Sequence, residues 1–180
     1  MKLIILDRDG VINQDSDDYI KSAQEWIPIP GSAEAITRLN HAGYTVAVAT
    51  NQSGLARNFF SVSDLNAMHD KMQKTVLKAG GKIEGIFYCP HGPNDGCDCR
   101  KPSPGLLLQI AERFSANLQD MYFVGDSLSD INAAKNAGAH PILVRTGKGR
   151  STENKISSDD KIPVYDNLYS FVNQFLSNAG

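Results

Sequence analysis

Residues 3–10 read Leu-Ile-Ile-Leu-Asp-Arg-Asp-Gly, and this stretch decides the fold. Its four consecutive apolar residues are typical of a strand that is buried on both faces, as strands are in a parallel sheet. The strand runs directly into two carboxylates, Asp7 and Asp9. In open α/β sheets, ligands bind beyond the carboxyl ends of the strands. The stretch therefore predicts an inner strand that carries two acidic side chains into a binding site.

The rest of the chain alternates strands with helices. Strand-like apolar runs recur at residues 45–49, 83–88, 121–124 and 141–144. Between them, apolar residues at helical spacing predict a helix capped by Ser32, a helix that starts at Ser63, helices over 106–114 and 131–137, and a closing helix over 168–175. Polar segments at 13–30 and 147–161 are interpreted as loops. This alternation predicts a single α/β domain over residues 1–180, with a doubly wound, Rossmann-like parallel sheet and helices on both faces.

The composition excludes several classes of protein. A length of 180 residues suits one domain with a sizeable core. With 20 acidic and 18 basic residues and a formal net charge of −2, the chain lacks the basic balance of a nucleic-acid-binding protein. No apolar run approaches the ~20 residues that cross a bilayer, and the N-terminus has no secretory signal. We therefore expect a soluble, cytoplasmic protein without nucleic-acid or membrane partners and, since the sequence indicates no large exposed apolar patch, a monomer.

Three strands end in polar residues at what we expect to be one edge of the sheet. Asp7 and Asp9 follow the first strand, Thr50 and Asn51 the second, and Asp126 the fourth. Carboxylates that lie so close repel each other, and a bound cation is the simplest way to keep them ionised. Mg²⁺ is bound in proteins by one or two carboxylates together with the phosphate of a substrate. The pattern therefore predicts a magnesium site at this edge.

Residues that bind anions accompany these acids. Thr50 and the amide groups of its loop suit phosphate oxygens, and the basic pair Arg100-Lys101 supplies fixed positive charge just before a helix. Together they predict Mg²⁺-assisted chemistry on an anionic substrate. Two other interpretations stay open. Asp-x-Asp-Gly is also common in turns, and Asp130 is as well suited to capping the helix that follows it as to supporting the site.

All three cysteines of the chain lie between residues 89 and 99. Cys89, His91, Cys97 and Cys99 supply three thiolates and one imidazole, which is a complete tetrahedral ligand set for structural Zn²⁺. An odd number of cysteines in one cluster is a poor disulfide framework, and the alternative is three free cysteines beside an unrelated histidine. Zinc would order a loop rich in Gly, Pro, Asn and Asp, and it would hold the basic pair that follows the last ligand.

With these motifs, the sequence resembles the haloacid dehalogenase (HAD) superfamily of phosphotransferases over nearly its whole length. Asp7-x-Asp9-Gly10 is similar to the first of the four superfamily motifs, Thr50 to the second, Lys101 to the third, and Gly125-Asp126 with Asp130 to the fourth. The resemblance implies that Asp7 is the nucleophile and that Asp9 is a general acid and then a base. It also implies a Mg²⁺ site made by Asp7, Asp126 and the backbone carbonyl of Asp9, with the phosphoryl group bound by Thr50 and Lys101.

Within the superfamily, the chain resembles small, capless phosphatases that act on heptose 1,7-bisphosphate or on histidinol phosphate. The cassette Cys-Pro-His at 89–91 with Cys-Asp-Cys-Arg-Lys-Pro at 97–102 carries this likeness. Segments 51–57 and 145–149 are more similar to the heptose enzymes, which implies removal of the C7 phosphate of D-glycero-D-manno-heptose 1,7-bisphosphate in the supply of ADP- or GDP-heptose for lipopolysaccharide core or surface glycans. Substrate contacts implied by the resemblance come from Asp15, Tyr19, Thr50, Asn51, Gln52, Ser53, Arg100 and Lys101.

Other residues have simpler interpretations. Trp26 is expected to pack beneath the 13–30 loop rather than against a sugar. His69 is expected to be a partly exposed residue of its helix, and residues 148–150 a solvated basic turn. For the whole protein the alternatives are a histidinol-phosphate phosphatase and, from another class, a zinc-stabilised interaction module without catalysis. The intact acids argue against the second, because a binding module has no need of both Asp7 and Asp9.

Overall fold

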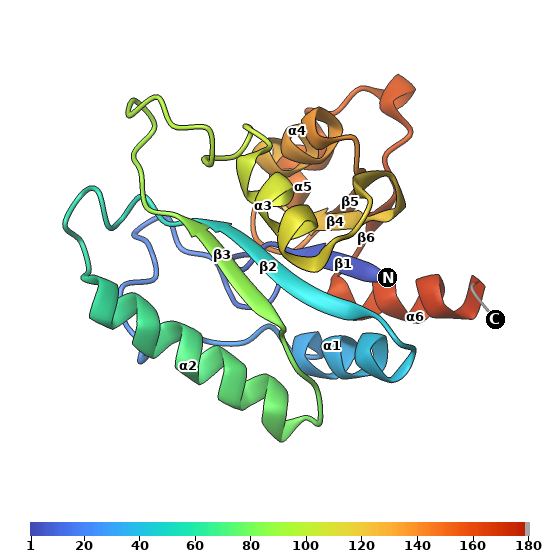
Figure 1. Ribbon diagram of the computed structural model, residues 1–180, viewed down its shortest axis with the longest axis horizontal. Coiled ribbons are helices and arrows are strands. Elements are labelled where there is room, and N and C mark those ends of the chain that lie inside the picture. Colours follow the sequence, from blue (N-terminus) through green and yellow to red (C-terminus); the bar gives the residue numbers. More distant parts are fainter. Residues whose placement is uncertain (179–180) are drawn as a thin grey trace.

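The computed structural model describes residues 1–178. Its centre is a six-stranded sheet in the order β3-β2-β1-β4-β5-β6, in which every neighbouring pair is parallel. The strands are β1 (Leu3–Leu6), β2 (Thr45–Asn51), β3 (Gly85–Cys89), β4 (Tyr122–Gly125), β5 (His140–Val144) and β6 (Val164–Tyr165). The strand order reverses direction beyond β1, which confirms the predicted doubly wound fold (Figure 1).

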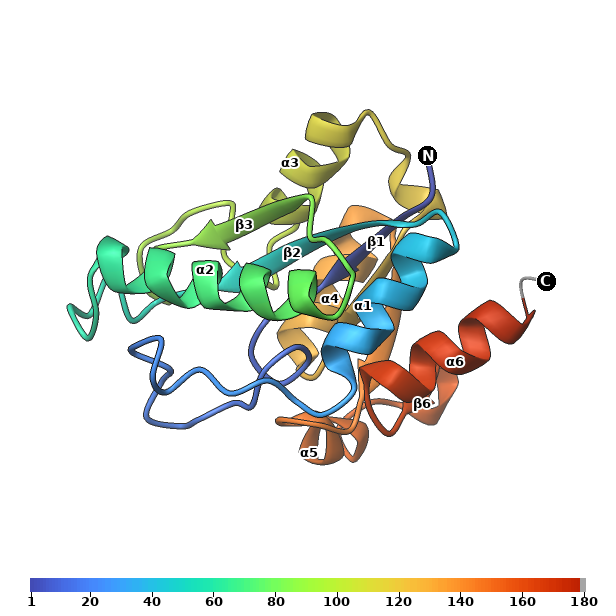
Figure 2. The same ribbon diagram turned by 90° about the horizontal axis from the view of Figure 1, so that it is seen from below.

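Helices cover both faces of the sheet, as predicted. They are α1 (Ser32–His41), α2 (Val62–Lys78), α3 (Gly105–Phe114), α4 (Leu128–Ala137), α5 (Gly149–Glu153) and α6 (Leu168–Asn178), with 3₁₀ turns at Leu118–Asp120 and Ser158–Asp160. α1, α2 and α6 pack on one face, which Figure 2 shows from their side, and α3 and α4 pack on the other. None of the described helices is both long and apolar enough to span a bilayer.

The alternation of side chains along β1 explains why four apolar residues stand in a row. Ile4 and Leu6 belong to the apolar cluster beneath α1, α2 and α6, whereas Leu3 and Ile5 belong to the cluster on the α3–α4 side. All four are fully buried, which contributes roughly 1.5–3 kcal/mol for each side chain relative to exposure. Because both faces hold the strand, the residues that follow it leave the sheet at a fixed point.

Two helix starts differ from the prediction. Ser32 is the first residue of α1 rather than its cap, since Gly31 takes the capping position with a φ of 85°. The Ser32 hydroxyl instead donates to the carbonyl of Ile12 at 2.8 Å. α2 begins at Val62 rather than at Ser63, because Ser61 caps it and forms a reciprocal capping box with Asp64. Asp64, three positions after Ser61, is the feature of the sequence that identifies this cap.

The segment 147–161 contains more structure than the predicted surface loop. α5 forms within it, and Gly149 and Thr152 of that helix are buried. The Thr152 hydroxyl donates to the carbonyl of Asp126 at 2.9 Å, which ties the segment to the end of β4. Beyond it, β6 pairs with β5 over two residues, a length too short to give a readable period in the sequence.

Candidate active site

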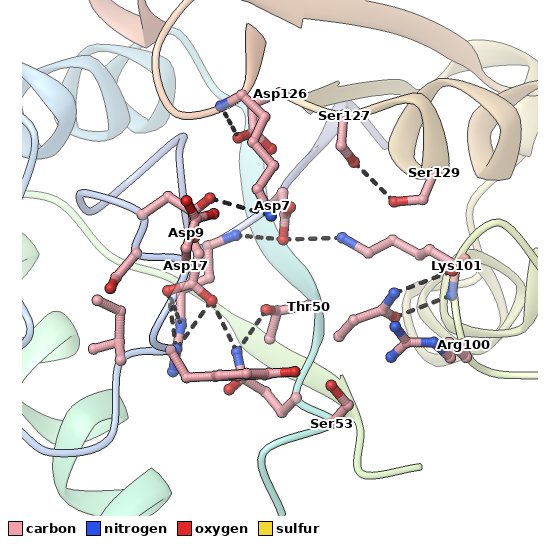
Figure 3. Close-up of a pocket in the computed structure, with 18 residues that line it drawn as sticks. Asp7, Asp9, Asp17, Thr50, Ser53, Arg100, Lys101, Asp126, Ser127 and Ser129 are labelled. Atoms are coloured by element: carbon pink, nitrogen blue, oxygen red, sulfur yellow. Dashed lines mark hydrogen bonds and ion pairs between the residues drawn. The ribbon is translucent and has the colours of Figure 1, made fainter. Parts of the chain in front are cut away.

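A pocket of about 290 Å³ opens at the carboxyl ends of the inner strands (Figure 3). Every residue predicted for catalysis, magnesium or substrate lines it, namely Asp7, Asp9, Asp15, Tyr19, Thr50, Asn51, Gln52, Ser53, Arg100, Lys101 and Asp126. The predicted zinc ligands lie beside it, with Cys89 at the end of β3 and the other three in the loop that follows. Ser16 and Asp17, within the predicted contact stretch from Asp15 to Tyr19, line the pocket too. The pocket also includes side chains that were not predicted from the sequence: Arg8, Ile20, Ser127, Ser129 and Lys148.

Asp7 follows the last residue of β1 and is buried at the floor of the pocket. Its Oδ1 accepts hydrogen bonds from the Arg8 amide at 2.7 Å and from Nζ of Lys101 at 2.9 Å. Burial and the nearby charge of Asp130 raise the pKa of Asp7 well above its usual value, and the Lys101 charge offsets only part of this. An ionised Asp7 therefore lacks enough positive charge around it from the protein alone.

Asp126 approaches Asp7 from the end of β4. Its Oδ2 accepts a hydrogen bond from the backbone N–H of Lys148 at 2.7 Å. Burial and the charge of Asp130 raise the pKa of Asp126 to about 7. A side-chain carbon at either Gly10 or Gly147 would collide with this carboxylate, and both glycines have positive φ. The two glycines therefore leave the space into which Asp126 fits.

Asp130 serves both of the roles that the sequence left open. It forms a capping box with Ser127 at the start of α4. Its Oδ1 also accepts from Nζ of Lys101 at 2.7 Å, and both side chains are buried. Burial alone would lower the pKa of Lys101, but the charges of Asp130 and Asp7 raise it above its ordinary value. Lys101 is thus a permanently charged group at the pocket floor, held also by the Ala49 carbonyl at 2.9 Å.

Three acids with one lysine make a site that fits a cation. Asp7, Asp126 and Asp130 each bring a carboxylate oxygen within 4.8 Å of the other two. Both oxygens of Asp130 are engaged by Lys101 and by the start of α4, so Asp7 and Asp126 are the pair suited to a metal. Their raised pKa values indicate uncompensated negative charge, which a hard divalent ion would neutralise.

Asp9 lies in surroundings opposite to those of Asp7. Its carboxylate accepts from the Arg8 guanidinium at 3.0 Å, from Asn13 at 2.8 Å and from Gln52 at 3.0 Å. Burial would raise the pKa of Asp9, but the Arg8 charge and these hydrogen bonds lower it below its ordinary value. The two acids of the motif are therefore differentiated by their neighbours, as acids with separate roles must be.

The end of β2 and the residues after it link the pocket to the loop of the predicted zinc ligands. Gln52 also donates to the Thr50 hydroxyl at 2.9 Å, which orients that hydroxyl. Asn51 and Lys101 exchange two hydrogen bonds, from Asn51 Nδ2 to the Lys101 carbonyl at 3.1 Å and from the Lys101 amide to Asn51 Oδ1 at 3.0 Å. Asn51 thus fixes the backbone of the lysine, and Ser53 lines the pocket beside it.

The 13–30 segment forms the outer wall of the pocket, as a loop. Oδ2 of Asp15 lies 3.6 Å from Nζ of Lys148, so this wall meets the turn after β5. The Tyr19 ring packs edge-on against Phe59 with 5.1 Å between centroids. Trp26 is fully buried beneath the loop, which agrees with the packing role expected from the sequence.

The predicted zinc ligands come together at the end of β3 and in the loop that follows it. Sγ of Cys99 lies 3.0 Å from Sγ of Cys89 and 3.3 Å from Nδ1 of His91, and Sγ of Cys97 lies 3.6 Å from Sγ of Cys89. Ligands of a tetrahedral Zn²⁺ at ~2.3 Å lie about 3.8 Å apart, so the cluster has the right size. Burial and the neighbouring thiols raise the pKa of Cys99 to about 12, a penalty that a bound dication would remove.

One interpretation from the sequence was incomplete and one was wrong. The turn at 148–150 is exposed at Lys148 and Arg150, as expected, but the Lys148 amide also donates to Asp126 and its side chain lines the pocket. The signal available was its position just beyond β5, a strand that ends at the same edge as β4. His69 is buried rather than partly exposed, and its Nε2 lies 3.4 Å from Nη1 of Arg8. No sequence pattern marks that contact, which depends on how α2 packs.

Known proteins are similar in sequence to this chain over nearly its whole length. Residues 98–170 match the HAD-hydrolase-like family. The chain is 52% identical to D-glycero-β-D-manno-heptose-1,7-bisphosphate 7-phosphatase of Pseudomonas putida, over 98% of this chain and 100% of that one. It is also 52% identical to the enzyme of the same name from Bordetella bronchiseptica, over 99% of this chain and 100% of that one. The chain belongs to this HAD phosphatase family.

Solved structures of the family agree. The structure matches that of D,D-heptose 1,7-bisphosphate phosphatase from B. bronchiseptica, complexed with magnesium and phosphate, with a TM-score of 0.96 over 99% of both chains. It matches the Burkholderia thailandensis enzyme with a TM-score of 0.78 at 44% identity, over 98% of this chain and 99% of that one. The resemblance deduced from the motifs is therefore confirmed, and the protein is a phosphoric monoester hydrolase of the HAD superfamily.

Proposed function

We propose that the protein removes the 7-phosphate of D-glycero-β-D-manno-heptose 1,7-bisphosphate. The observation that carries this proposal is the whole-length identity of 52% to two enzymes of that name, combined with one pocket that gathers every predicted site residue. The names of these relatives favour the heptose substrate over histidinol phosphate, and they favour the β anomer at C1. The same likeness argues against a non-catalytic interaction module.

The two acids divide the reaction between them. Asp7 attacks the phosphorus, the bond from phosphorus to O7 of the heptose breaks, and Asp9 gives its proton to O7. Water then attacks the aspartyl phosphate, Asp9 takes the proton of that water, and phosphate leaves with Asp7 restored. The lowered pKa of Asp9 suits the second step, and the dianionic phosphoryl group of an arriving substrate raises that pKa for the first.

Magnesium fits the acidic end of the pocket. Asp7, Asp126 and the backbone carbonyl of Asp9 would hold it, and when bound it neutralises charge on the transferring phosphoryl group. Lys101, which pairs with Asp7, and Thr50, which lines the same pocket, would bind the remaining phosphoryl oxygens. Because these side chains are held in place before the substrate binds, they can stabilise the transition state without first having to move.

The outer part of the pocket would bind the rest of the substrate. Arg100 and the wall residues Asp15 and Tyr19 surround the opening with charge and hydrogen-bonding groups. Asn51, Gln52 and Ser53 also line the pocket. Zinc at the four-ligand cluster would have no open position, so its role is to order the loop that carries Arg100 and Lys101. The single domain over 1–180, the monomeric state, the cytoplasmic location and the glycan pathway stay predictions from the sequence.

Phosphate release by the purified protein with Mg²⁺ tests the proposal. The substrates are the α and β anomers of heptose 1,7-bisphosphate and histidinol phosphate. We expect the highest kcat/KM with the β-bisphosphate and loss of turnover in Asp9→Asn, with the fold retained. A preference for histidinol phosphate would make that compound the substrate instead of the heptose bisphosphate. Failure to release phosphate from any of the three would contradict the proposal.

A further inference from the structure

A side chain that the proposed reaction does not use lies directly behind Asp9. The side chain of Arg8 is 1% exposed, so its guanidinium carries a buried positive charge. Its Nε donates to Oδ1 of Asp9 at 3.2 Å, and its Nη2 reaches both carboxylate oxygens at 3.0 Å. A forked contact of this kind fixes orientation as well as supplying energy. The guanidinium therefore sets the direction of the Asp9 carboxylate.

The far edge of the same guanidinium is held by α2. Nη1 of Arg8 lies 3.4 Å from Nε2 of His69 and 4.0 Å from Sδ of Met68. A guanidinium has donors only, so Nε2 of His69 is the acceptor and the ring proton is on Nδ1. Burial and the Arg8 charge lower the pKa of His69 to about 4, so the ring is neutral at pH 7. The two side chains of α2 thus give Nη1 its acceptors.

The remaining partners of Asp9 come from loops. Asn13 and Gln52 each donate one hydrogen bond to the carboxylate, from the segments after β1 and after β2. Arg8 is the partner that connects Asp9 to a regular helix, through His69 and Met68. Groups held by packed helices keep their geometry better than groups held by loops, and a displacement of ~1 Å can lower a rate 10²-fold.

We propose that His69 is a positioning residue for the reaction: by accepting a hydrogen bond from Arg8 it orients the guanidinium and, through it, aims Asp9 at the leaving-group oxygen. This inference rests on the proposed function, in which Asp9 gives a proton to O7 as the O7–P bond breaks and regains one from water. His69 itself neither gains nor loses a proton in the cycle.

Two kinds of leaving group distinguish this role from general structural damage. An alkoxide needs the proton of Asp9 to depart, whereas 4-nitrophenolate departs without one. Because kcat/KM covers only the steps up to the first phosphoryl transfer, it excludes the later attack of water. His69→Leu should therefore lower kcat/KM for heptose 1,7-bisphosphate about tenfold or more, and that for 4-nitrophenyl phosphate by less than about twofold.

Two control variants sharpen the comparison. Every variant is assayed as the Mg²⁺- and Zn²⁺-loaded protein. His69→Gln keeps an acceptor and should stay within about threefold of the wild type on both substrates. Gln73→Leu removes another hydrogen bond of α2, from Gln73 Nε2 to the Ile83 carbonyl at 3.1 Å, and should change neither substrate. Equal losses on both substrates in His69→Leu, or a His69→Gln variant as slow as His69→Leu, would overturn the inference.

A measurement on the unaltered protein does not depend on any variant. NMR of nitrogen-labelled protein should find the His69 ring neutral at pH 7 with its proton on Nδ1. A proton on Nε2 would contradict the contact with Arg8 and overturn the inference. Wild-type protein that releases no phosphate from the bisphosphate would contradict the proposed function instead, and the His69 tautomer would still decide whether Nε2 accepts from Arg8.

Discussion

Asp7 and Asp9 are separated by one residue, yet their surroundings affect their charges in opposite ways. Burial beside Asp126 and Asp130 disfavours the charge of Asp7, whereas the Arg8 guanidinium favours the charge of Asp9. Both effects arise where β1 ends, because successive residues there turn toward different neighbours. The same substitution at the two positions should therefore change stability in opposite directions.

Asp7→Asn should abolish turnover and also stabilise the metal-free protein. Asparagine is nearly isosteric and keeps an acceptor for the Arg8 amide, but it removes a buried charge that the protein compensates poorly. We expect a gain of about 1 kcal/mol, or roughly 3 °C in Tm for a domain of this size. Asp9→Asn should instead lower Tm, because it leaves the buried Arg8 charge without its carboxylate. Thermal unfolding at pH 8 with a chelator checks both signs.

Magnesium binding should be linked to pH through Asp126. Without metal, its pKa of about 7 means that the carboxyl is largely protonated below pH 7 and ionised above it. Because Mg²⁺ binds the ionised form, its apparent affinity should fall at least tenfold for each pH unit below ~7, and protonation of Asp7, whose pKa is also raised, should add to that fall. Calorimetric titrations in buffers of different ionisation enthalpy should also detect proton release at pH 7. An affinity constant between pH 5.5 and 8 would contradict this linkage.

At the scale of elements, the turn between β5 and α5 shapes the metal site. Gly147→Ala would place a methyl group against the Asp126 carboxylate, at a φ of 55°. Gly43→Ala is the matched control, since Gly43 has a φ of 83° and open space around it. Both variants should lose roughly 1–2 kcal/mol of stability from their backbone conformation, but only Gly147→Ala should lose Mg²⁺ affinity and activity. Metal titration of both folded variants decides the matter.

Loss of metal from the loop of the predicted zinc ligands should weaken substrate binding more than it disturbs the sheet. Cys97→Ser is expected to lose the metal and to loosen residues 90–104, so that KM rises because Arg100 and Lys101 lose their support. The exposed Asn94→Ser, in the same loop, is the control and should keep zinc and KM. Zinc analysis, hydrogen exchange across the loop and steady-state kinetics test this. Unchanged exchange in zinc-free Cys97→Ser would show that the loop orders itself.

The elements show which features a sequence reveals. β1 and the pocket residues after it were predictable, because an apolar run ending in acids is a local pattern. Thr50 and Asp126 followed from the same rule at β2 and β4. The helix starts were misplaced by one residue, because Gly31 rather than Ser32 caps α1 and because Ser61 precedes Ser63 at α2. The burial of His69 depends on the packing of α2 against the pocket, and no local pattern encodes such packing.

At the scale of the whole molecule, we expect a monomer that unfolds in one step. The exposed large apolar side chains of the described residues are spread over α2, α3, α4, α6, the N-terminus and two loops, rather than gathered in one element. Two apolar clusters share the same sheet, so neither face can open alone. Sedimentation equilibrium and a comparison of calorimetric with van't Hoff enthalpy for the metal-loaded protein test both points. A stable dimer would locate an interface that the apolar surface does not suggest.

The place of Lys148 has a consequence for how the chain is made. Its amide holds Asp126, and the Thr146 hydroxyl just before it donates to the carbonyl of Gly10 at 2.6 Å. A ribosome delivers β1 first and this turn late, and domains fold as units as they are released. A nascent chain that ends before the turn thus carries its nucleophile without a finished metal pocket. Prematurely terminated products should be inert toward phosphate esters and should not sequester magnesium.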